Sequence, residues 1–441
     1  MPLSRVLAIT LRLIAMSLGL AAVVLAALWY PSRPPKEMRG IWESEGYGLV
    51  FDVSPFVIRI HEISPVSCLP WQSFPAHLGL ARTLAGYDMS VVDGQLRVEV
   101  SDIINDVTAV KRDGLPSQCL QGRPAGPRET YDVFWQTLAT YYPFFDLHGI
   151  DWDARRDRAL ADIGESYDPA VLVRVLKESL SGIEDRHVNL ITPEGDYTPK
   201  VAAEWDKDAR DFWQVSDSYL VSARQIVETG GIRHGWLDGD IAYMAFHHME
   251  TEPSLADQQV DEAQRIVAGL AAVYANAAGV IIDNRFNNGG SDAVALIYAG
   301  LFSGADWSAG TKVTQIAPGV FTPPTEVIAR GAPSPLTVPV VVMNSRETVS
   351  AGEIFALALR ELPQVRLIGE NTNGSLSDMM VRDLPNGWQF TLSHQVYRNP
   401  DGVIFESSGI PPHETYAFDV DGFLEGRDTL LEHAQAMLSP D

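Results

Sequence analysis

The chain has 441 residues, more than one average domain, so two or three domains with apolar cores are expected. Hydrophobic residues make up 46% and charged residues 20%, a composition that excludes extended disorder. With 33 basic and 57 acidic residues the net charge is −24, and no basic stripe occurs. No nucleic-acid partner is therefore expected.

The first feature along the chain is an apolar segment. Residues 13–30 carry no charge, follow Arg5 and Arg12, and precede several prolines. This order is typical of a signal sequence or signal anchor, to which residues 1–36 are assigned. An uncleaved membrane anchor is the favoured interpretation, and a cleaved signal peptide stays open. Either one predicts an extracytoplasmic protein, in the periplasm or at the cell surface.

Residues 37–122 show short strands separated by turns, the pattern of a small β domain. The expected strands are Leu49–Val53, Phe56–Ile63, Met89–Val92 and Leu96–Val100. The only two cysteines, Cys68 and Cys119, lie here, and an even pair in an exported chain predicts one disulfide. Two buried free thiols are the alternative. No ligand cluster adjoins them, so they do not predict a zinc site.

A proline- and glycine-rich linker is expected at residues 123–128, followed by a helical subdomain over residues 129–200. Phe134, Leu138, Tyr141 and Phe145 repeat at helical spacing. Asp168 followed by Pro169 is typical of the N-cap and first turn of a second helix.

Residues 201–425 are expected to form an α/β core, because strands and helices alternate from residue 240 onward. The expected strands are Ile241–Phe246, Val280–Asp283, Leu336–Met343 and Val365–Gly369. Helices are expected over residues 256–274, over residues 293–302 and directly after Ser350.

The segment T-V-S-A-G-E, residues 348–353, joins a buried strand to the start of a helix. Ser350 is therefore expected beside the free N–H groups and positive dipole end of that helix, where a developing oxyanion is stabilised. A serine that only caps the helix is the alternative.

Two further motifs accompany it. D-N-R-F-N-N-G-G, residues 283–290, follows a strand, and its paired glycines allow close backbone approach or present N–H groups. The Gly-Lys-Ser/Thr ending of a phosphate loop is absent. D-R-H, residues 185–187, follows the second helix of the helical subdomain.

Together these motifs resemble those of the tail-specific or C-terminal-processing serine peptidases of the S41 type, in the histidine-using branch related to the tricorn core. The resemblance extends over about residues 130–415. It implies a crotonase-like α/β core, a polypeptide substrate, and Ser350 as nucleophile. It also implies that the N–H of Ala351 and that of Gly289 or Gly290 stabilise the oxyanion.

The resemblance also implies the catalytic base. The lysine-using branch has a lysine about 25 positions after the serine, and Ser375 stands there instead. His187 matches the histidine of the other branch, and Glu406 matches its carboxylate. An imidazole can take the serine proton and a carboxylate can orient the imidazole. The alternatives are a histidine that only ends a helix and a solvated loop glutamate.

Two features depart from that pattern. Arg186 stands where the tricorn-like branch has a serine, so Asp185 or Asp378 could orient His187 in place of Glu406. Ser377, with Asp378, either lines the site or turns the chain. No segment between residues 187 and 240 resembles a PDZ module.

The remaining histidines give no metal motif. His247 and His248 are adjacent, and His413-Glu414 lacks a second histidine, so no metal or cofactor is expected. The sequence thus predicts a membrane-anchored serine endopeptidase or carboxy-terminal processing protease. A non-catalytic binding protein for an apolar ligand or peptide on the same fold is the alternative. The oligomeric state is not predicted.

Overall fold

The computed structural model describes residues 32–100, 104–122, 126–221, 227–229, 231–251 and 258–439. The predicted anchor, residues 13–30, lies outside these residues. Within them, no helix is both long enough and apolar enough to cross a membrane.

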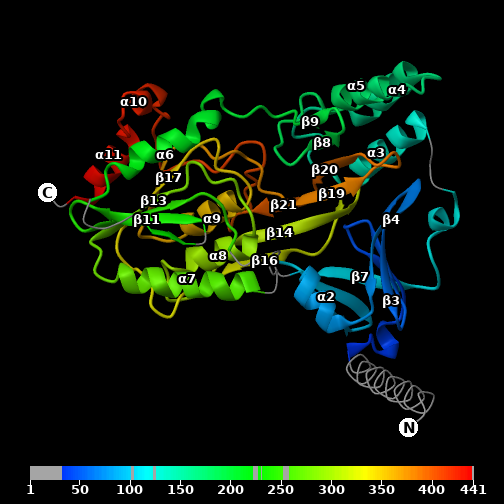
Figure 1. Ribbon diagram of the computed structural model, residues 1–441, viewed down its shortest axis with the longest axis horizontal. Helices are drawn as coiled ribbons and strands as arrows, with labels where there is room; N and C mark the ends of the chain where they lie inside the picture. Colours follow the sequence, from blue (N-terminus) through cyan, green and yellow to red (C-terminus); the bar gives the residue numbers. More distant parts are fainter. Residues whose placement is uncertain are drawn as a thin grey trace, which may run out of the picture.

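The first part of the chain forms a seven-stranded antiparallel sheet, the N-terminal sheet, in the order β4-β3-β2-β1-β7-β6-β5 (Figure 1). Its elements are β1 (Gly40–Ser44), β2 (Leu49–Val53), β3 (Val57–Ser64), β4 (Ser67–Pro75), α2 (Leu78–Ala85), β5 (Tyr87–Val92), β6 (Gln95–Val100) and β7 (Val107–Arg112). Buried Trp42, Phe51 and Leu96 belong to its own core. Cys68 and Cys119 form the predicted disulfide.

Three helices and a four-stranded sheet form the helical lobe. The helices are α3 (Pro127–Tyr141), α4 (Trp152–Ile163) and α5 (Pro169–Leu180). The strands, in the order β19-β20-β8-β9, are β8 (Asn189–Thr192), β9 (Gly195–Tyr197), β19 (Met379–Asp383) and β20 (Gln389–Ser393). Phe134 on α3 packs on Phe390 of β20, with ring centroids 5.1 Å apart. The Asp168 carboxylate caps α5 by accepting from the Ala170 N–H at 3.0 Å, as predicted.

The large-sheet lobe is built on strands in the order β10-β11-β12-β13-β17-β18-β22. They are β10 (Val227–Thr229), β11 (Ile232–Leu237), β12 (Ile241–Phe246), β13 (Gly279–Asp283), β17 (Val340–Asn344), β18 (Val365–Gly369) and β22 (Glu414–Thr415). The pairs from β12 to β22 are parallel, and those formed by β10 and β11 are antiparallel. The result is a mixed α/β fold.

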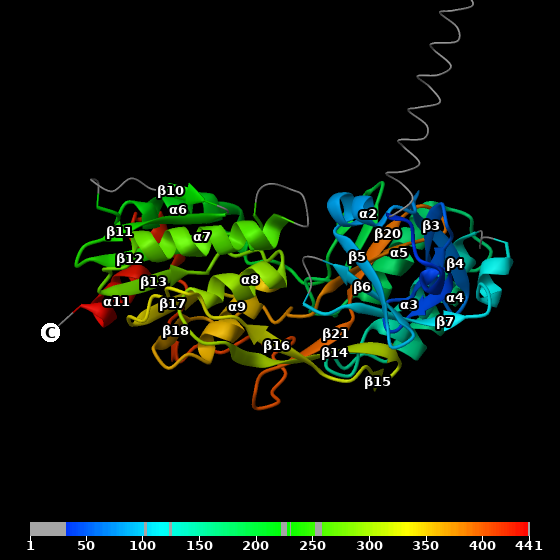
Figure 2. The same ribbon diagram turned by 90° about the horizontal axis from the view of Figure 1, so that it is seen from below.

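Helices cover both faces of this sheet (Figure 2). They are α6 (Ala209–Asp217), α7 (Gln259–Val273), α8 (Asp292–Gly300), α9 (Ala351–Arg360), α10 (Val420–Leu424) and α11 (Thr429–Leu438). Val280 and Ile282 of β13 pack in the core that includes α7, α8 and α9, whereas Ile281 packs in the core that includes α11. This alternation follows from the two-residue period of a strand and explains why β13 is apolar throughout.

A fourth sheet, the bridging sheet, joins the two lobes. It contains β14 (Trp307–Ala317), β15 (Val320–Phe321), β16 (Thr325–Ala329) and β21 (Gln395–Arg398), with β14 paired to each of the other three. Figures 1 and 2 show β14 and β21 running from the large-sheet lobe toward the helical lobe. The sequence analysis did not predict these strands.

Several element bounds differ from the predictions. The strand expected at Leu336–Met343 begins at Val340, because Pro339 has no N–H for the ladder. Helix α3 ends at Tyr141, so Phe145 lies beyond it. Helix α3 also begins at Pro127, inside the expected linker, whose residues 123–125 lie outside the described chain.

Candidate active site

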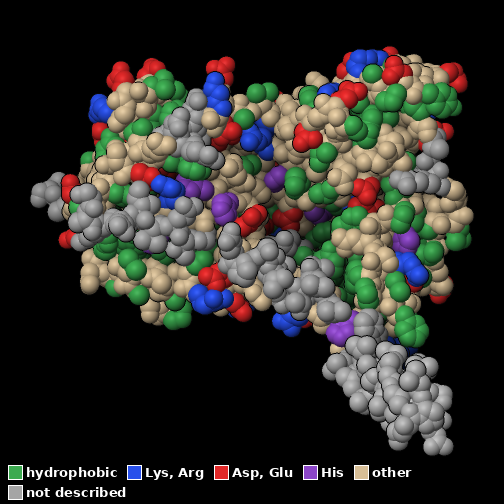
Figure 3. Space-filling model, viewed as in Figure 1, with side chains coloured by type: hydrophobic (Ala, Val, Ile, Leu, Met, Phe, Trp, Pro, Cys, Tyr) green, Lys and Arg blue, Asp and Glu red, His purple; other side chains and the backbone are tan. Residues whose placement is uncertain are grey.

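A cleft of about 600 Å³ contains four of the predicted site residues: His187, Gly290, Ser350 and Asp378. Its other lining residues are Arg186, Glu250, Gln259, Asn288, Ser291, Asp292, Val349 and Met379. Figure 3 shows a hollow between the two halves of the molecule in which acidic and histidine side chains gather. The motifs that were far apart in the sequence therefore meet at one cleft.

Ser350 lies in the turn between β17 and α9. Its φ of 58° and ψ of −128° are rare for a residue with a side chain and cost about 1–3 kcal/mol. Its N–H donates to the Ser375 carbonyl at 3.1 Å and to Glu353 Oε2 at 3.3 Å. The Glu353 N–H donates to the Ser350 backbone carbonyl at 2.7 Å. Backbone groups and Glu353 therefore hold this turn, and Ser350 with Glu353 forms the capping box of α9.

The paired glycines lie against this turn. A Cβ on Gly289 would lie 2.6 Å from Ser350 Cβ, and the φ of Gly289 is +86°, so glycine is required there. The Gly289 N–H donates to Asn287 Oδ1 at 3.0 Å. In the described chain, the N–H groups of Gly290 and Ala351 have no acceptor. These two N–H groups are therefore available to an anion, whereas that of Gly289 is not.

Glu353 and Ser375 tie the serine turn to the histidine segment. The buried Glu353 carboxylate accepts from Thr372 Oγ1 at 2.6 Å, from the Gly374 N–H at 2.7 Å and from the Ser375 N–H at 2.8 Å. Ser375 Oγ accepts from the Arg186 N–H at 3.1 Å. The serine at the lysine position thus has a positional part in the site.

His187 lies between α5 and β8 and is 7% exposed. Its N–H donates to Asp185 Oδ1 at 2.8 Å, and its carbonyl accepts from Thr391 Oγ1 at 2.6 Å. Burial lowers the pKa of His187 from its ordinary 6.5, while the charges of Asp185 and Asp378 oppose this. The imidazole is therefore neutral at neutral pH. It shares the cleft with Ser350, but no hydrogen bond joins the two among the described residues.

Glu406 and Asp185 are two further buried carboxyl groups, and the charge of Asp185 acts on both Glu406 and His187. Glu406 Oε2 accepts from the N–H groups of Leu376 and Ser377 at 3.1 and 3.2 Å. Glu406 Oε1, Asp185 Oδ2 and His187 Nδ1 are buried and have no hydrogen-bond partner within the described structure. Burial, then the charge of Asp185, raises the pKa of Glu406 well above its ordinary value. Burial therefore favours the neutral form of the Glu406 carboxyl group.

Asp378 belongs to a separate buried network. Lys312 Nζ lies 3.0 Å from Asp378 Oδ2, and the Tyr397 hydroxyl lies 2.9 Å from Asp378 Oδ1. The same hydroxyl lies 2.5 Å from Asp292 Oδ2. Although burial opposes ionisation, the Lys312 ammonium lowers the pKa of Asp378. Burial and the charge of Asp378 raise the pKa of Asp292 to about 8. Both Asp378 oxygens are thus engaged away from His187.

The sequence analysis missed three members of this network. Lys312 and Tyr397 lie on β14 and β21, strands that it did not predict, and a buried lysine in a strand has no local signal. Asp292 did have a local signal in the sequence, because it directly follows N-N-G-G-S at an expected helix start.

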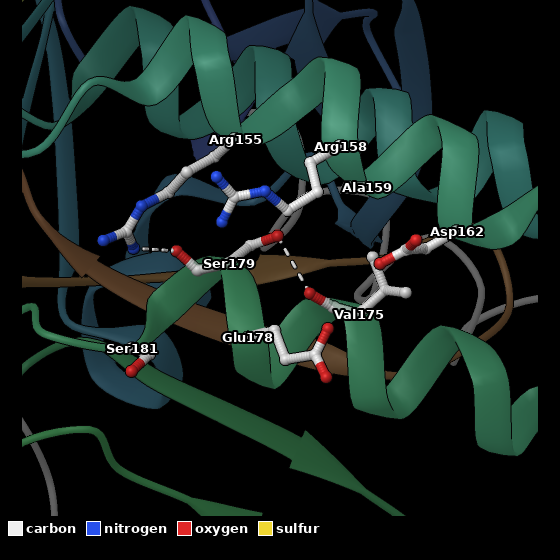
Figure 4. Close-up of a pocket in the computed structure, with 8 residues that line it drawn as sticks. All are labelled: Arg155, Arg158, Ala159, Asp162, Val175, Glu178, Ser179 and Ser181. Atoms are coloured by element: carbon white, nitrogen blue, oxygen red, sulfur yellow. Dashed lines mark hydrogen bonds between the residues drawn. The ribbon is translucent and has the colours of Figure 1, made fainter.

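A second cavity, of about 340 Å³, lies between α4 and α5 (Figure 4). Arg155 and Arg158 project into it from α4, and Arg155 Nη1 donates to the Ser179 carbonyl at 2.5 Å. No residue predicted to take part in catalysis lines this cavity. The chemistry is therefore assigned to the first cleft.

Residues 240–416 match the model of peptidase family S41. This part of the chain is therefore similar to the S41 peptidases. Family S41 peptidases are serine-type hydrolases. The matched residues include Ser350, the paired glycines and Glu406, whereas His187 precedes them.

Comparison with individual proteins agrees with this family. The carboxy-terminal processing protease CtpA of Bacillus subtilis is 31% identical over 136 residues, which are 31% of this chain and 28% of that relative. The match thus spans less than a third of the curated relative. A putative peptidase from Parabacteroides merdae has a similar structure, with a TM-score of 0.61 and 25% identity over 72% of this chain and 98% of the other. Mature CPAF has a similar fold, with a TM-score of 0.54 and 10% identity over 71% and 96%.

Proposed function

We propose that this protein is a serine endopeptidase or carboxy-terminal processing protease that hydrolyses polypeptides with Ser350 and His187. The observation that carries the proposal is the strained turn at Ser350, which shares a cleft with a neutral histidine and lies beside two unused N–H groups. A hydroxyl, a base and oxyanion donors are what acyl transfer requires.

The proposed reaction follows from these groups. Ser350 Oγ attacks the scissile carbonyl carbon while His187 takes its proton, and the N–H groups of Gly290 and Ala351 stabilise the oxyanion. His187 then gives the proton to the departing amine, which leaves an acyl-enzyme. A water molecule, deprotonated by His187, hydrolyses that ester and regenerates Ser350.

Asp185 and Glu406 together are proposed to orient the imidazole. Asp185 bonds the His187 backbone and is first among the charges that raise the pKa of this histidine. Burial favours the neutral form of Glu406, and the charge of Asp185 raises the pKa of Glu406 further. Asp185 therefore stabilises the imidazolium directly. Glu406, which lies near Asp185 but makes no hydrogen bond to the imidazole within the described structure, helps to position the Asp185 carboxylate. Asp378 is assigned no such role, because Lys312 and Tyr397 engage it.

The carrier of an apolar ligand is the weaker candidate, because charged and polar side chains make up most of the cleft lining. Such a lining suits a peptide backbone better than an apolar molecule.

The finer organisation is also proposed. The parallel strands of the large sheet support a crotonase-like core over residues 201–425, with a helical subdomain at 129–200 and a small β domain at 37–122. We propose that residues 13–30 anchor the protein to a membrane and that the peptidase acts outside the cytoplasm. The disulfide is consistent with this compartment.

The test uses the full-length protein and a reduced, alkylated protein as substrate, with fragments read by mass spectrometry. Wild type and Ser408→Ala are expected to cleave it, because Ser408 is exposed and bonds only nearby carbonyls. Ser350→Ala is expected to be inactive. Cleavage by a folded Ser350→Ala protein would refute the assignment, and saturable binding of a fatty acid without any cleavage would favour the carrier.

A further inference from the structure

The turn between β1 and β2, residues 45–48, packs between α3 of the helical lobe and β14 of the bridging sheet. A Cβ on Gly46 would lie 2.5 Å from Thr314 Cγ2 on β14, and a Cβ on Gly48 would lie 2.8 Å from the Tyr141 hydroxyl on α3. Both glycines have positive φ, +81° and +55°. The turn therefore fits its site closely, and any larger residue would push it out.

Tyr47 lies at the centre of this turn. Its hydroxyl accepts from Gln395 Nε2 at 2.9 Å and from Asn105 Nδ2 at 2.8 Å. Its ring meets the His394 ring edge-on, with centroids 5.0 Å apart. Burial, followed by the charge of Asp378, raises the pKa of Tyr47. The Tyr47 side chain is thus neutral, and it lies close enough to Asp378 for the two groups to interact electrostatically.

A buried ion pair strengthens the same contact. Arg382 Nη1 lies 3.4 Å from Glu62 Oε1, and the two side chains are 6% and 5% exposed. Glu62 Oε2 accepts from the Asp383 N–H at 2.9 Å, and Arg382 also donates to the Tyr47 carbonyl. The N-terminal sheet is therefore fixed to β19 as well as to β21.

The residues held by Tyr47 hold the cleft wall in turn. The N–H groups of His394 and Gln395 both donate to Ser377 Oγ at 3.0 Å, and His394 Nδ1 donates to the Asp378 carbonyl at 3.2 Å. The Ser377 N–H binds Glu406, and Asp378 lines the cleft. A continuous set of contacts thus leads from Tyr47 to the carboxyl groups beside His187.

We propose that Tyr47 is a positioning residue of the active site, through which the N-terminal sheet holds residues 375–378, the segment that brings Asp378 to the cleft wall. This inference rests on the proposed function of Ser350 for its kinetic consequence. Because a displacement of about 1 Å at a catalytic centre can cost on the order of 100-fold in rate, loss of this support slows catalysis without removing a catalytic group.

The experiment compares Tyr47→Ala and Tyr47→Phe with Phe51→Leu in the full-length protein. Phe51 is buried in the core of the N-terminal sheet and serves as the matched control, because its change weakens that sheet without touching His394 or Gln395. The first readout, taken well below each melting temperature, is the rate at which a serine-directed phosphonate labels Ser350. We expect a fall of about tenfold or more for Tyr47→Ala, a smaller fall for Tyr47→Phe and no change for Phe51→Leu.

The second readout does not need activity. Hydrogen–deuterium exchange of the amides of residues 376, 377, 394 and 395 is expected to quicken in Tyr47→Ala and to stay as in wild type in Phe51→Leu. Unchanged exchange at these amides in Tyr47→Ala would overturn the inference, as would an equal loss of labelling in Phe51→Leu. If wild type is not labelled at all, the proposed function fails, and the exchange result still decides whether Tyr47 holds the wall.

Discussion

The two sides of the cleft are built in different ways. Ser350 is held by backbone groups: its turn is fixed by N–H and carbonyl bonds, and the glycine beside it leaves no room for a side chain. In the described part of the structure, His187 Nδ1 and Asp185 Oδ2 are buried without a hydrogen-bond partner. The proposed nucleophile is thus held by the contacts of its own turn, whereas the proposed base lies near Asp185 of its own segment and Asp378 of a distant one. Substitutions should therefore act differently on the two sides.

The largest effect is expected from the reacting pair. Ser350→Ala and His187→Ala should each lower kcat by on the order of 10³–10⁶-fold, and the double variant should lose little more, because nucleophile and base act as one unit. Steady-state peptide hydrolysis measures this. Multiplicative losses in the double variant would show that the two residues act independently.

The next effect tests the backbone side. Gly289→Ala should lower kcat by about 100-fold, since the new Cβ would displace Ser350. Gly387→Ala is the matched control, because Gly387 has a similar φ of +87° with nothing within 4 Å of its Cβ position. Both changes should cost about 1–2 kcal/mol of stability. Equal activity of the two variants in a kcat assay would contradict a steric role for Gly289.

A graded effect is expected among the carboxyl groups. Asp185→Asn should lower kcat by roughly 10²–10⁴-fold, because it removes the charge nearest the imidazolium. Glu406→Gln should cost less, about tenfold or under by the strength of one hydrogen bond, because burial favours the neutral form of Glu406, which a glutamine resembles. A severe Glu406→Gln loss beside a mild Asp185→Asn loss would restore Glu406 as the direct partner of His187.

The smallest catalytic effect is expected from the disulfide, which lies in the N-terminal sheet. Replacing Cys68 and Cys119 by serine should cost about 2–5 kcal/mol of unfolding free energy, because the bond closes a long loop. Urea denaturation monitored by fluorescence measures this loss. Hydrolysis by the folded fraction should stay near the wild-type rate, and a loss as large as that of Tyr47→Ala would show that the whole N-terminal sheet, not Tyr47, supports the cleft.

The sequence predicted the main strands and helices of the large-sheet lobe better than it predicted the strands of the bridging sheet. Apolar runs such as Ile241–Phe246 and the strand-to-helix turn at Ser350 are local signals, so four strands and three helices of the large-sheet lobe were recognised, whereas β10, β11, β22, α6, α10 and α11 were not. The bridging strands β14 and β21 were missed, because Lys312 and the alternating polar residues of β14 gain their burial only from tertiary pairing.

Long-range side-chain contacts set a similar limit. Arg382 meets Tyr47 across 335 positions of the sequence, a contact for which neither residue carries a local signal. The close approach of Gly289 to Ser350 could be expected from paired glycines after a strand, but which glycine N–H stays free depended on Asn287. Sequence motifs therefore indicated the proposed catalytic residues, whereas the side-chain contacts that hold these residues in place were seen only in the structure.

The central claim is that Ser350 is a nucleophile activated by a buried, neutral His187. The most direct measurement is the pH dependence of phosphonate labelling, with the modified residue identified by mass spectrometry. Because burial lowers the pKa of His187, the labelling rate should rise with pH through a midpoint below 6.5 and then level off. His187→Ala should label slowly, without that transition. Labelling at a residue other than Ser350, or the same transition in His187→Ala, would contradict the account.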